Sequence, residues 1–372
     1  LGSQPNRNAW SADAESQSRR LIRRIIRLTD GGRRFMLCDG DEELPGLKPL
    51  VAMALDLAGN KADRAAAATV ISPAVETRVT RTDRKDLPKA SLNSEWSEVA
   101  VMSAGWAKSD ARLAIAYAGD PLRVEFHVGN RALWSGLVTA ETTCDGQRVA
   151  TSGKWEETCW QSDKDCDFLE LRMQLEGGLR LERQFVLAKR DGVLTVADIV
   201  IANDLEPRQL QHRFSLPLAA DVSWQPEVET HDGVLAFGKR RAAVLPLALH
   251  EWRCDPRGGS LTSDGARLTI TQSAHGRAMY CPLMFDLDSS RSKKERTWRQ
   301  LTVGENLQVL PHDVAVGFRG QSGRDQWLVY RSHGPCGNRT VLGQNIANEF
   351  YAGRFRKSGL VDEWIEIEVM SK

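Results

Sequence analysis

Apolar and polar residues alternate along residues 168–200, and this alternation is the strongest structural signal in the chain of 372 residues. Gly177-Gly178 and Asp191-Gly192 divide the stretch into three runs. A period of two residues, broken by two-residue glycine turns, is typical of an antiparallel meander. The stretch therefore predicts three consecutive β-strands.

The first run predicts which face of this meander is buried. Leu169, Leu171 and Met173 fall on one side of an extended chain, while Glu170 and Arg172 fall on the other. We expect the leucine face to pack in a core, and the charged face to meet either water or charges of opposite sign.

The N-terminal ninety residues show the helical period instead. Residues 9–30 predict a helix with leucine and isoleucine on one stripe and five arginines around it, ended by Gly31-Gly32. Residues 47–58 and 61–69 predict two shorter helices, and residues 80–90 predict a linker. The Arg-rich helix is a candidate surface for a membrane, an acidic partner or a second copy of the chain. The alternative is that its apolar stripe packs on the body and its arginines are solvated.

From Trp96 onward, short alternating runs separated by glycine and proline turns predict about twenty strands. We expect a mainly β fold, a large antiparallel two-sheet super-sandwich preceded by a short helical segment. The predicted domains are 1–90, the helical segment and linker, and 91–372, the super-sandwich. No repeat of fixed period occurs, which excludes a propeller or solenoid.

Charge and composition narrow the classes of function. Lysine and arginine number 50 and aspartate and glutamate 49, so a bulk nucleic-acid binder is not expected. No apolar run approaches the ~18 residues of a transmembrane helix. No secretory signal pattern is present, so we expect a cytoplasmic chain or one exported after processing. The seven cysteines contain no CxxC pair, which predicts buried free thiols, or one or two disulfides, and no zinc ribbon.

Several segments resemble the C-terminal β domain of heparinase II/III-like proteins. They are residues 94–106 (SEWSEVAVMSAGW), 133–146 (LWSGLVTAETTCDG), 181–200 (LERQFVLAKRDGVLTVADIV) and 211–217 (QHRFSLP). The resemblance implies a galactose-mutarotase-like super-sandwich that associates with acidic polysaccharides.

The chain departs from the lyases of that family in two ways. Ninety N-terminal residues are too few for the helical toroid that forms half of their substrate cleft. Their His-x-His-x-x-Asp-like loop corresponds here to residues 125–130 (EFHVGN), with one histidine. Two functions therefore stay open. One is a polysaccharide lyase acting by β-elimination, and the other is a non-catalytic carbohydrate-binding or structural subunit on the same scaffold.

Lyase chemistry on a uronate needs a cation for the carboxylate, a base and an acid, and tyrosine with histidine is the usual pair. The chain has four tyrosines, three of them beside histidine or arginine. The catalytic candidates are Tyr280 with His275 and Arg277, Tyr330 with His333, and His212. The substrate-binding candidates are Arg331, Tyr351, Arg354 and two sugar-stacking tryptophans, Trp134 and Trp160. The alternative for each is a structural role at a strand end or in the core.

Alternate acids at Asp163, Asp165 and Asp167 could converge on Ca²⁺ or, less characteristically, on Zn²⁺. The alternative is a polar turn at the entry to a strand. No G-x-S-x-G, P-loop or HExxH motif occurs. A homo-oligomer formed through the Arg-rich helix or through exposed strand edges is the remaining partner hypothesis.

Overall fold

The computed structural model describes residues 11–31, 33–38, 46–71, 87–204, 206–254 and 258–368. The chain divides into two compact units. The N-terminal unit comprises Leu1–Ala116 and Arg123–Ser135, and the C-terminal unit comprises Tyr117–Leu122 and Gly136–Lys372. The division predicted at residue 90 stays a prediction, and most of the predicted linker lies outside the described residues.

Three helices form the first part of the N-terminal unit, and each matches a predicted segment. They are α1 (Ala12–Arg27), α2 (Leu47–Ala58) and α3 (Lys61–Val70). The Ser11 side chain caps α1 by accepting from the Ala14 amide, and Asn60 and Asp63 form a capping box on α3. Ile22 and Ile26 of α1 are buried in one cluster with residues of α2 and α3. The isoleucines of the Arg-rich helix therefore pack within its own unit, while Leu21 is 59% exposed.

Three arginines of α1 also form ion pairs or hydrogen bonds inside this unit. Arg23 pairs with buried Asp63 at 2.6 Å, and Arg19 pairs with Glu15. Arg27 donates to the Lys89 carbonyl and stacks over the ring of Trp106 at 5.9 Å. These contacts occupy much of the basic face, so oligomerisation through it stays a prediction.

Short antiparallel strands complete the N-terminal unit. They are β1 (Thr29–Asp30), β2 (Arg34–Phe35), β3 (Leu92–Ser94), β4 (Val99–Ser103), β5 (Ala111–Ala116) and β6 (Leu122–Val128). Strand β7 (Arg131–Cys144) begins in this unit and ends in the C-terminal unit.

The C-terminal unit is built around an eight-stranded antiparallel sheet, here called the middle sheet. Its order is β14 (Val222–Pro226), β15 (Gly233–Phe237), β16 (Arg240–Pro246), β19 (Ala278–Asp286), β12 (Val193–Ala202), β11 (Leu179–Ala188), β10 (Cys166–Leu175) and β9 (Glu156–Ser162). The predicted meander is β10–β11–β12. Gly177, Gly178 and Gly192 have positive φ in its two turns, which glycine adopts without steric cost.

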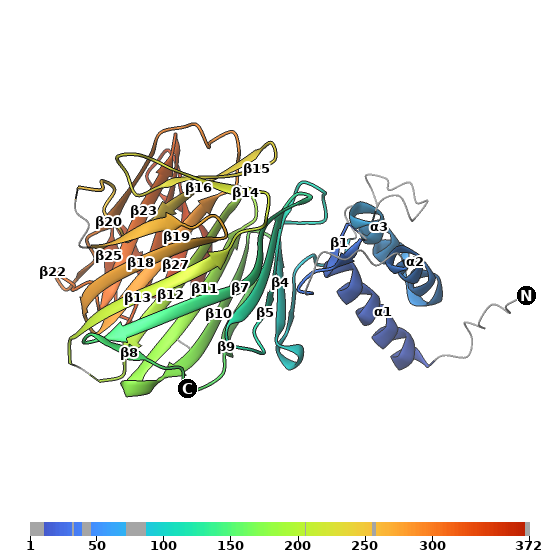
Figure 1. The fold of residues 1–372 in the computed structure, drawn as a ribbon, viewed down its shortest axis with the longest axis horizontal. Helices are drawn as coiled ribbons and strands as arrows, with labels where there is room; N and C mark the ends of the chain where they lie inside the picture. Colours follow the sequence, from blue (N-terminus) through green and yellow to red (C-terminus); the bar gives the residue numbers. More distant parts are fainter. Residues whose placement is uncertain are drawn as a thin grey trace, which may run out of the picture. The chain divides into compact units, whose positions relative to one another are not determined.

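Three other sheets complete this unit (Figure 1). The outer sheet contains β17 (Gly259–Ser263), β18 (Arg267–Gly276), β13 (Arg208–Pro217) and β7, with β8 (Gln147–Val149) paired to β7. The C-terminal sheet contains β20 (Arg296–Leu301), β23 (Ala315–Ser322), β24 (Asp325–Ser332), β27 (Phe350–Phe355) and β28 (Val361–Ile367). A small sheet contains β22 (Gln308–Val309), β21 (Gly304–Glu305), β25 (Arg339–Val341) and β26 (Gln344–Ile346).

The middle sheet is covered on both faces. Phe168 and Val186 pack with Phe318 and Val329 of the C-terminal sheet in one apolar cluster. The opposite face meets the outer sheet, and all ten residues of β12 are buried. A strand that is covered on both faces has a nearly continuous run of apolar residues, and β12 has such a sequence (VLTVADIVIA).

The predicted fold class is confirmed, since the chain is mainly β, antiparallel and preceded by a short helical segment. The C-terminal sheet adds a layer beyond the two that the sequence predicted. All seven cysteines are free thiols, three of them buried. Among the described helices, none is both long and apolar enough to cross a membrane.

Candidate functional site

Two adjoining hollows of about 370 Å³ each lie on the outward face of the outer sheet. They share Glu141 and Arg213, and we call them together the outer groove. Each volume is in the range of about 300–1,000 Å³ that is common for small-ligand sites.

The central part of the outward face of this sheet carries mainly hydrogen-bonding side chains. Strand alternation fixes which residues point outward, because His212 and Phe214 point inward from β13 and Arg213 between them is exposed. Register places Arg213 between Glu141 of β7 and Thr271 of β18. In the part where all three strands pair side by side, the nine outward positions are Thr139, Glu141 and Thr143, Gln211, Arg213 and Ser215, and Thr269, Thr271 and Ser273. None of the nine is apolar.

Three arginines and two carboxylates line the outer groove, which leaves one excess positive charge. Arg148 lies 3.2 Å from Glu141, and both side chains are largely exposed. Arg267 donates to the Leu137 carbonyl at 2.7 Å and to the Thr139 hydroxyl at 2.9 Å, so it is held across β7. Burial lowers the pKa of Arg267, the Asp264 carboxylate raises it, and the neighbouring charge of Arg213 lowers it further. Guanidinium groups that line one hollow can pair with an anion.

The structure brings together three of the predicted residues from separate stretches of sequence. Tyr280 of β19, Arg331 of β24 and His333 meet between the middle and C-terminal sheets. The Tyr280 hydroxyl donates to Gln184 at 3.1 Å, and its ring lies 6.1 Å from that of His333. Burial raises the pKa of Tyr280, so its hydroxyl stays protonated and is not available as a base.

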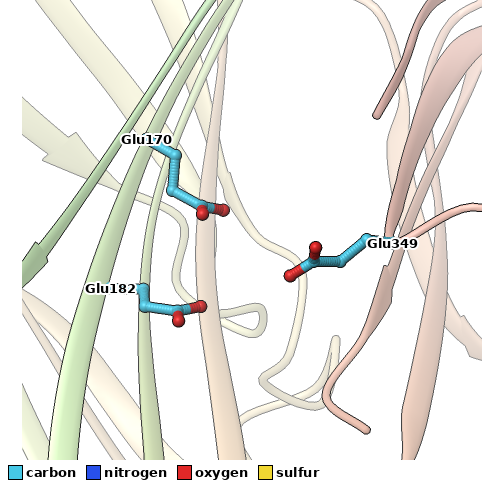
Figure 2. A group of neighbouring side chains, drawn as sticks. All are labelled: Glu170, Glu182 and Glu349. Atoms are coloured by element: carbon cyan, nitrogen blue, oxygen red, sulfur yellow. The ribbon is translucent and has the colours of Figure 1, made fainter. Parts of the chain in front are cut away.

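Arg331 is surrounded by three glutamates, and together these residues form the glutamate–arginine cluster. Its guanidinium lies 2.9 Å from Glu170, 2.7 Å from Glu182 and 2.8 Å from Glu349. Figure 2 shows Glu170 and Glu182 on neighbouring strands of one sheet, with Glu349 facing them. Within the described residues these are the only acidic, histidine or cysteine side chains grouped closely enough for a metal. Arg331 supplies the positive charge there, so we assign the group to an internal ion network.

The pKa values of the cluster follow from its charges. Burial raises the pKa of Glu182, but Arg331, Arg180 and Arg172 outweigh it and bring that pKa to about 2. Burial raises the pKa of Glu349, and Arg331 only partly offsets this. Burial and Arg331 lower the pKa of His333 to about 3. His333 is half-buried as a residue, but both ring nitrogens are shielded and find no hydrogen-bond partner among the described residues. It is therefore a neutral imidazole beside the cluster.

The other tyrosine candidates do not join this group. Tyr330 is buried on the opposite face of β24, where its hydroxyl accepts from Arg339 at 2.9 Å. Burial raises the pKa of Tyr330, and it raises that of half-buried Tyr351 to about 12. Arg354 pairs with Asp191 at 2.6 Å and with Asp325.

The Tyr280 neighbours in sequence also lie apart from it. His275 is exposed on the outward face of β18, two residues beyond Ser273. Arg277 lies 3.5 Å from Asp313. The predicted triad of Tyr280, His275 and Arg277 is therefore not assembled.

His212 has a structural role instead of facing a cleft. Its Nε2 lies 2.8 Å from Asp198, and its Nδ1 lies 2.9 Å from the Thr142 hydroxyl. Arg183 donates to both carboxylate oxygens of Asp198, at 2.6 and 2.7 Å. We call Arg183, Asp198 and His212 the aspartate–histidine cluster. All three are buried between the middle and outer sheets.

The tryptophan candidates offer little surface to a sugar. Trp134 is fully buried, 4.9 Å from Phe126, so the stacking role predicted for it does not fit this structure. Trp160 is half-buried on β9 opposite Leu169. Neither ring lines the outer groove.

The aspartate run forms a turn and ion pairs, and its carboxylates are not among the described side chains grouped closely enough for a metal. Asp163 accepts from the amides of Asp165 and Cys166, Asp165 pairs with Arg190 at 3.1 Å, and buried Asp167 pairs with Lys189 at 2.8 Å. The turn alternative therefore holds for Asp163, Asp165 and Asp167.

Millimolar Ca²⁺ or Zn²⁺ should accordingly leave the thermal midpoint of unfolding unchanged. A site with a Kd a hundredfold below the added concentration would stabilise the fold by about 2.7 kcal/mol. Calorimetry with and without a chelator measures this, and a clear rise of the midpoint with either metal would contradict the assignment of both carboxylate groups.

The sequence reasoning missed the outer groove. Arg213 stands next to the candidate His212 in QHRFSLP, and alternation on this strand would have placed the arginine outward and the histidine inward. Glu141 and Arg267 gave no local signal, because their proximity to Arg213 depends on strand order.

No family model matches the chain, and no curated protein sequence matches it. Solved structures do match. The heparan sulfate lyase HepC from Pedobacter heparinus aligns at a TM-score of 0.60 and 9% identity, covering 91% of this chain and 54% of that one. A heparinase III (the BT4657 gene product) aligns at 0.59 and 9%, covering 87% and 54%. The chain thus spans about half the length of these proteins, and the resemblance of its fold to the heparinase III structures is confirmed.

Proposed function

We propose that this chain binds an acidic polysaccharide in the outer groove. The observation that carries the proposal is the outward face itself, where hydroxyl, amide and carboxylate groups surround Arg148, Arg213 and Arg267. Sugar hydroxyls donate to and accept from such side chains, and guanidinium groups pair with carboxylates and sulfates through two parallel hydrogen bonds. The fold shared with the heparinase III structures supports a carbohydrate ligand.

The burial and positions of the tyrosines favour binding without β-elimination. A tyrosine base must reach the substrate, but Tyr117, Tyr280 and Tyr330 are 2%, 3% and 0% exposed. None of the four tyrosines lines the outer groove. The second candidate function is that of a lyase, because the fold resembles that of the heparinase III structures.

Replacing Arg213 with glutamine should weaken binding of an acidic glycan by about 10- to 100-fold, since a hydrogen bond to a charged group contributes about 1.5–3 kcal/mol. Isothermal titration against heparan sulfate, chondroitin sulfate and polygalacturonate, with dextran as a neutral glycan, measures this. Arg190→Gln is the matched control, because Arg190 is 71% exposed and pairs with Asp165 away from the groove. Equal affinities for the two variants, or no binding to any acidic glycan, would reject the proposal.

The same glycans should give no ultraviolet absorbance of unsaturated uronates. If absorbance appears and is lost in Tyr280→Phe, Tyr330→Phe or Tyr351→Phe, the chain is a lyase and binding alone is the wrong function.

A further inference from the structure

The N-terminal unit holds a separate pocket of about 430 Å³. The β1–β2 hairpin, the end of α3, residues 106–112 and the β6–β7 turn form its walls. Met36, Val70 and Trp106 supply an apolar side, and the rest of the lining is mainly polar or charged.

The pocket wall is fixed by specific contacts. The Trp106 indole donates to the Pro88 carbonyl at 2.6 Å. The Asp110 carboxylate accepts from the Ala107 amide at 2.8 Å, and a Cβ at Gly105 would lie 2.5 Å from this carboxylate. The glycine at position 105 therefore lets the loop pass close to the Asp110 carboxylate.

The lining has an excess of two positive charges. Its cations are Arg33, Lys108, Arg112 and Arg131, and its carboxylates are those of Asp30 and Asp110. Asp30 forms an ion pair with Arg33 at 3.3 Å, and Asp110 accepts a hydrogen bond from the Ala107 amide. Lys108 and Arg131 are both exposed at the rim.

A buried histidine lies at the inner wall of this pocket. His127 Nε2 lies 2.6 Å from the Glu125 carboxylate, and Arg34 holds the same carboxylate at 2.6 and 3.1 Å. Burial raises the pKa of Glu125, but hydrogen bonds from His127 and Arg34 leave it below its usual value. His127 Nδ1 is 3.7 Å from Asp30, which is longer than a hydrogen bond. Glu125 thus orients the ring, and Nδ1 is on the side of the pocket residue Asp30.

We propose that this pocket binds a small phosphate monoester, with the phosphate at the cations and the organic group against the apolar side. Two excess positive charges match the charge of about −1.5 to −2 that a phosphate monoester carries at neutral pH, whereas a monocarboxylate would leave one uncompensated. The volume exceeds what a bare phosphate fills, which leaves room for a group of monosaccharide size. His127 contributes a ring nitrogen to the inner wall. The proposal does not depend on the outer groove, whose residues all belong to the other unit.

Isothermal titration with glucose 6-phosphate, inorganic phosphate, inorganic sulfate and glucose tests this site. We expect saturable binding of glucose 6-phosphate, weaker binding of the two inorganic anions, and none of glucose. Lys108→Met and Arg131→Met should each weaken glucose 6-phosphate binding by about tenfold or more. Lys239→Met, which removes an exposed lysine from the C-terminal unit, should leave it unchanged.

Thermal melts of each variant show whether it folds, and the rim positions are chosen because they are exposed. Absence of saturable binding by the folded wild-type chain would overturn the proposal. So would unchanged affinity in both rim variants. Loss of glucose 6-phosphate binding in Arg213→Gln would place the ligand in the outer groove and overturn it as well, while loss of glycan binding alone in that variant leaves the pocket standing.

Discussion

Replacing Arg331 with methionine should lower the free energy of unfolding by about 3–5 kcal/mol, because it removes the shared cation of buried carboxylates. Arg331 is 1% exposed and lies within 2.9 Å of Glu170, Glu182 and Glu349. Methionine fills much of the same space, so the loss would come from the uncompensated charges more than from a cavity. Urea unfolding at neutral pH measures the difference.

The control for this variant is Arg190→Met, which breaks a pair whose arginine is 71% exposed. Exposed pairs contribute about 0–1 kcal/mol, so this variant should unfold close to the wild type. If both variants lose the same stability, the glutamate–arginine cluster contributes no more than a surface pair.

Acid should bring the stability of the wild type closer to that of the Arg331 variant. The folded pKa of Glu182 is about 2, below its ordinary value of 4.5, so its contribution is present above 4.5 and is lost as the pH falls toward 2. Without Arg331 that pKa rises, and the variant has already lost this contribution at neutral pH. The free energy of unfolding should therefore fall less in the variant than in the wild type between about pH 4.5 and about pH 3. Equal slopes would show that Arg331 does not set the pKa of Glu182.

The glutamate–arginine cluster shows where sequence patterning succeeds and where it stops. Alternation placed Glu170 on the face opposite Leu169, and the structure agrees. That face is buried because a second sheet covers it, and its carboxylates meet Arg331 from a strand more than 140 residues later. The alternative of paired charges, left open by the sequence, is the correct one. Which charge pairs with which depends on the packing of sheets, which no local pattern contains.

Two strands, β9 and β20, show no clear alternation of apolar and polar residues, for a related reason. Strand β9 carries one large apolar residue, Trp160, and β20 carries Trp298 between polar neighbours. Both lie at the edges of their sheets, where one side of the strand has no partner strand. Most positions of these two strands are only partly buried, so they carry few apolar residues and show no clear alternation.

Candidate chemistry was harder to predict than the fold for the same reason. Tyr280, Arg331 and His333 were each singled out, but in two separate groups. They meet only because β24 packs over the middle sheet. The tyrosines also fill the core, so a residue type suited to lyase chemistry serves packing here.

Replacing Arg183 with methionine should also cost about 3–5 kcal/mol, and this deficit should likewise shrink in acid. Arg183 holds both oxygens of Asp198 and lies 5.1 Å from the ring of Trp155. Burial raises the pKa of Asp198, but Arg183 and His212 outweigh it and bring that pKa to about 2. The contribution of Asp198 is therefore present above its ordinary pKa of 3.8 and is lost as the pH falls toward 2. Without Arg183 that pKa rises, and the variant has already lost this contribution at neutral pH. The deficit of the variant should therefore be smaller at about pH 3 than at about pH 7.

The double variant Arg183→Met with Asp198→Asn tests whether charge causes this deficit. Removing both charges leaves no carboxylate in the aspartate–histidine cluster, so the double variant should recover part of the lost stability and lose the pH dependence that comes from Asp198. Urea unfolding of the wild type, the single variant and the double variant at the two pH values provides the comparison. A double variant less stable than Arg183→Met at both pH values would mean that packing of Arg183 against Trp155 and Phe214, at 5.1 and 6.0 Å, outweighs its charge.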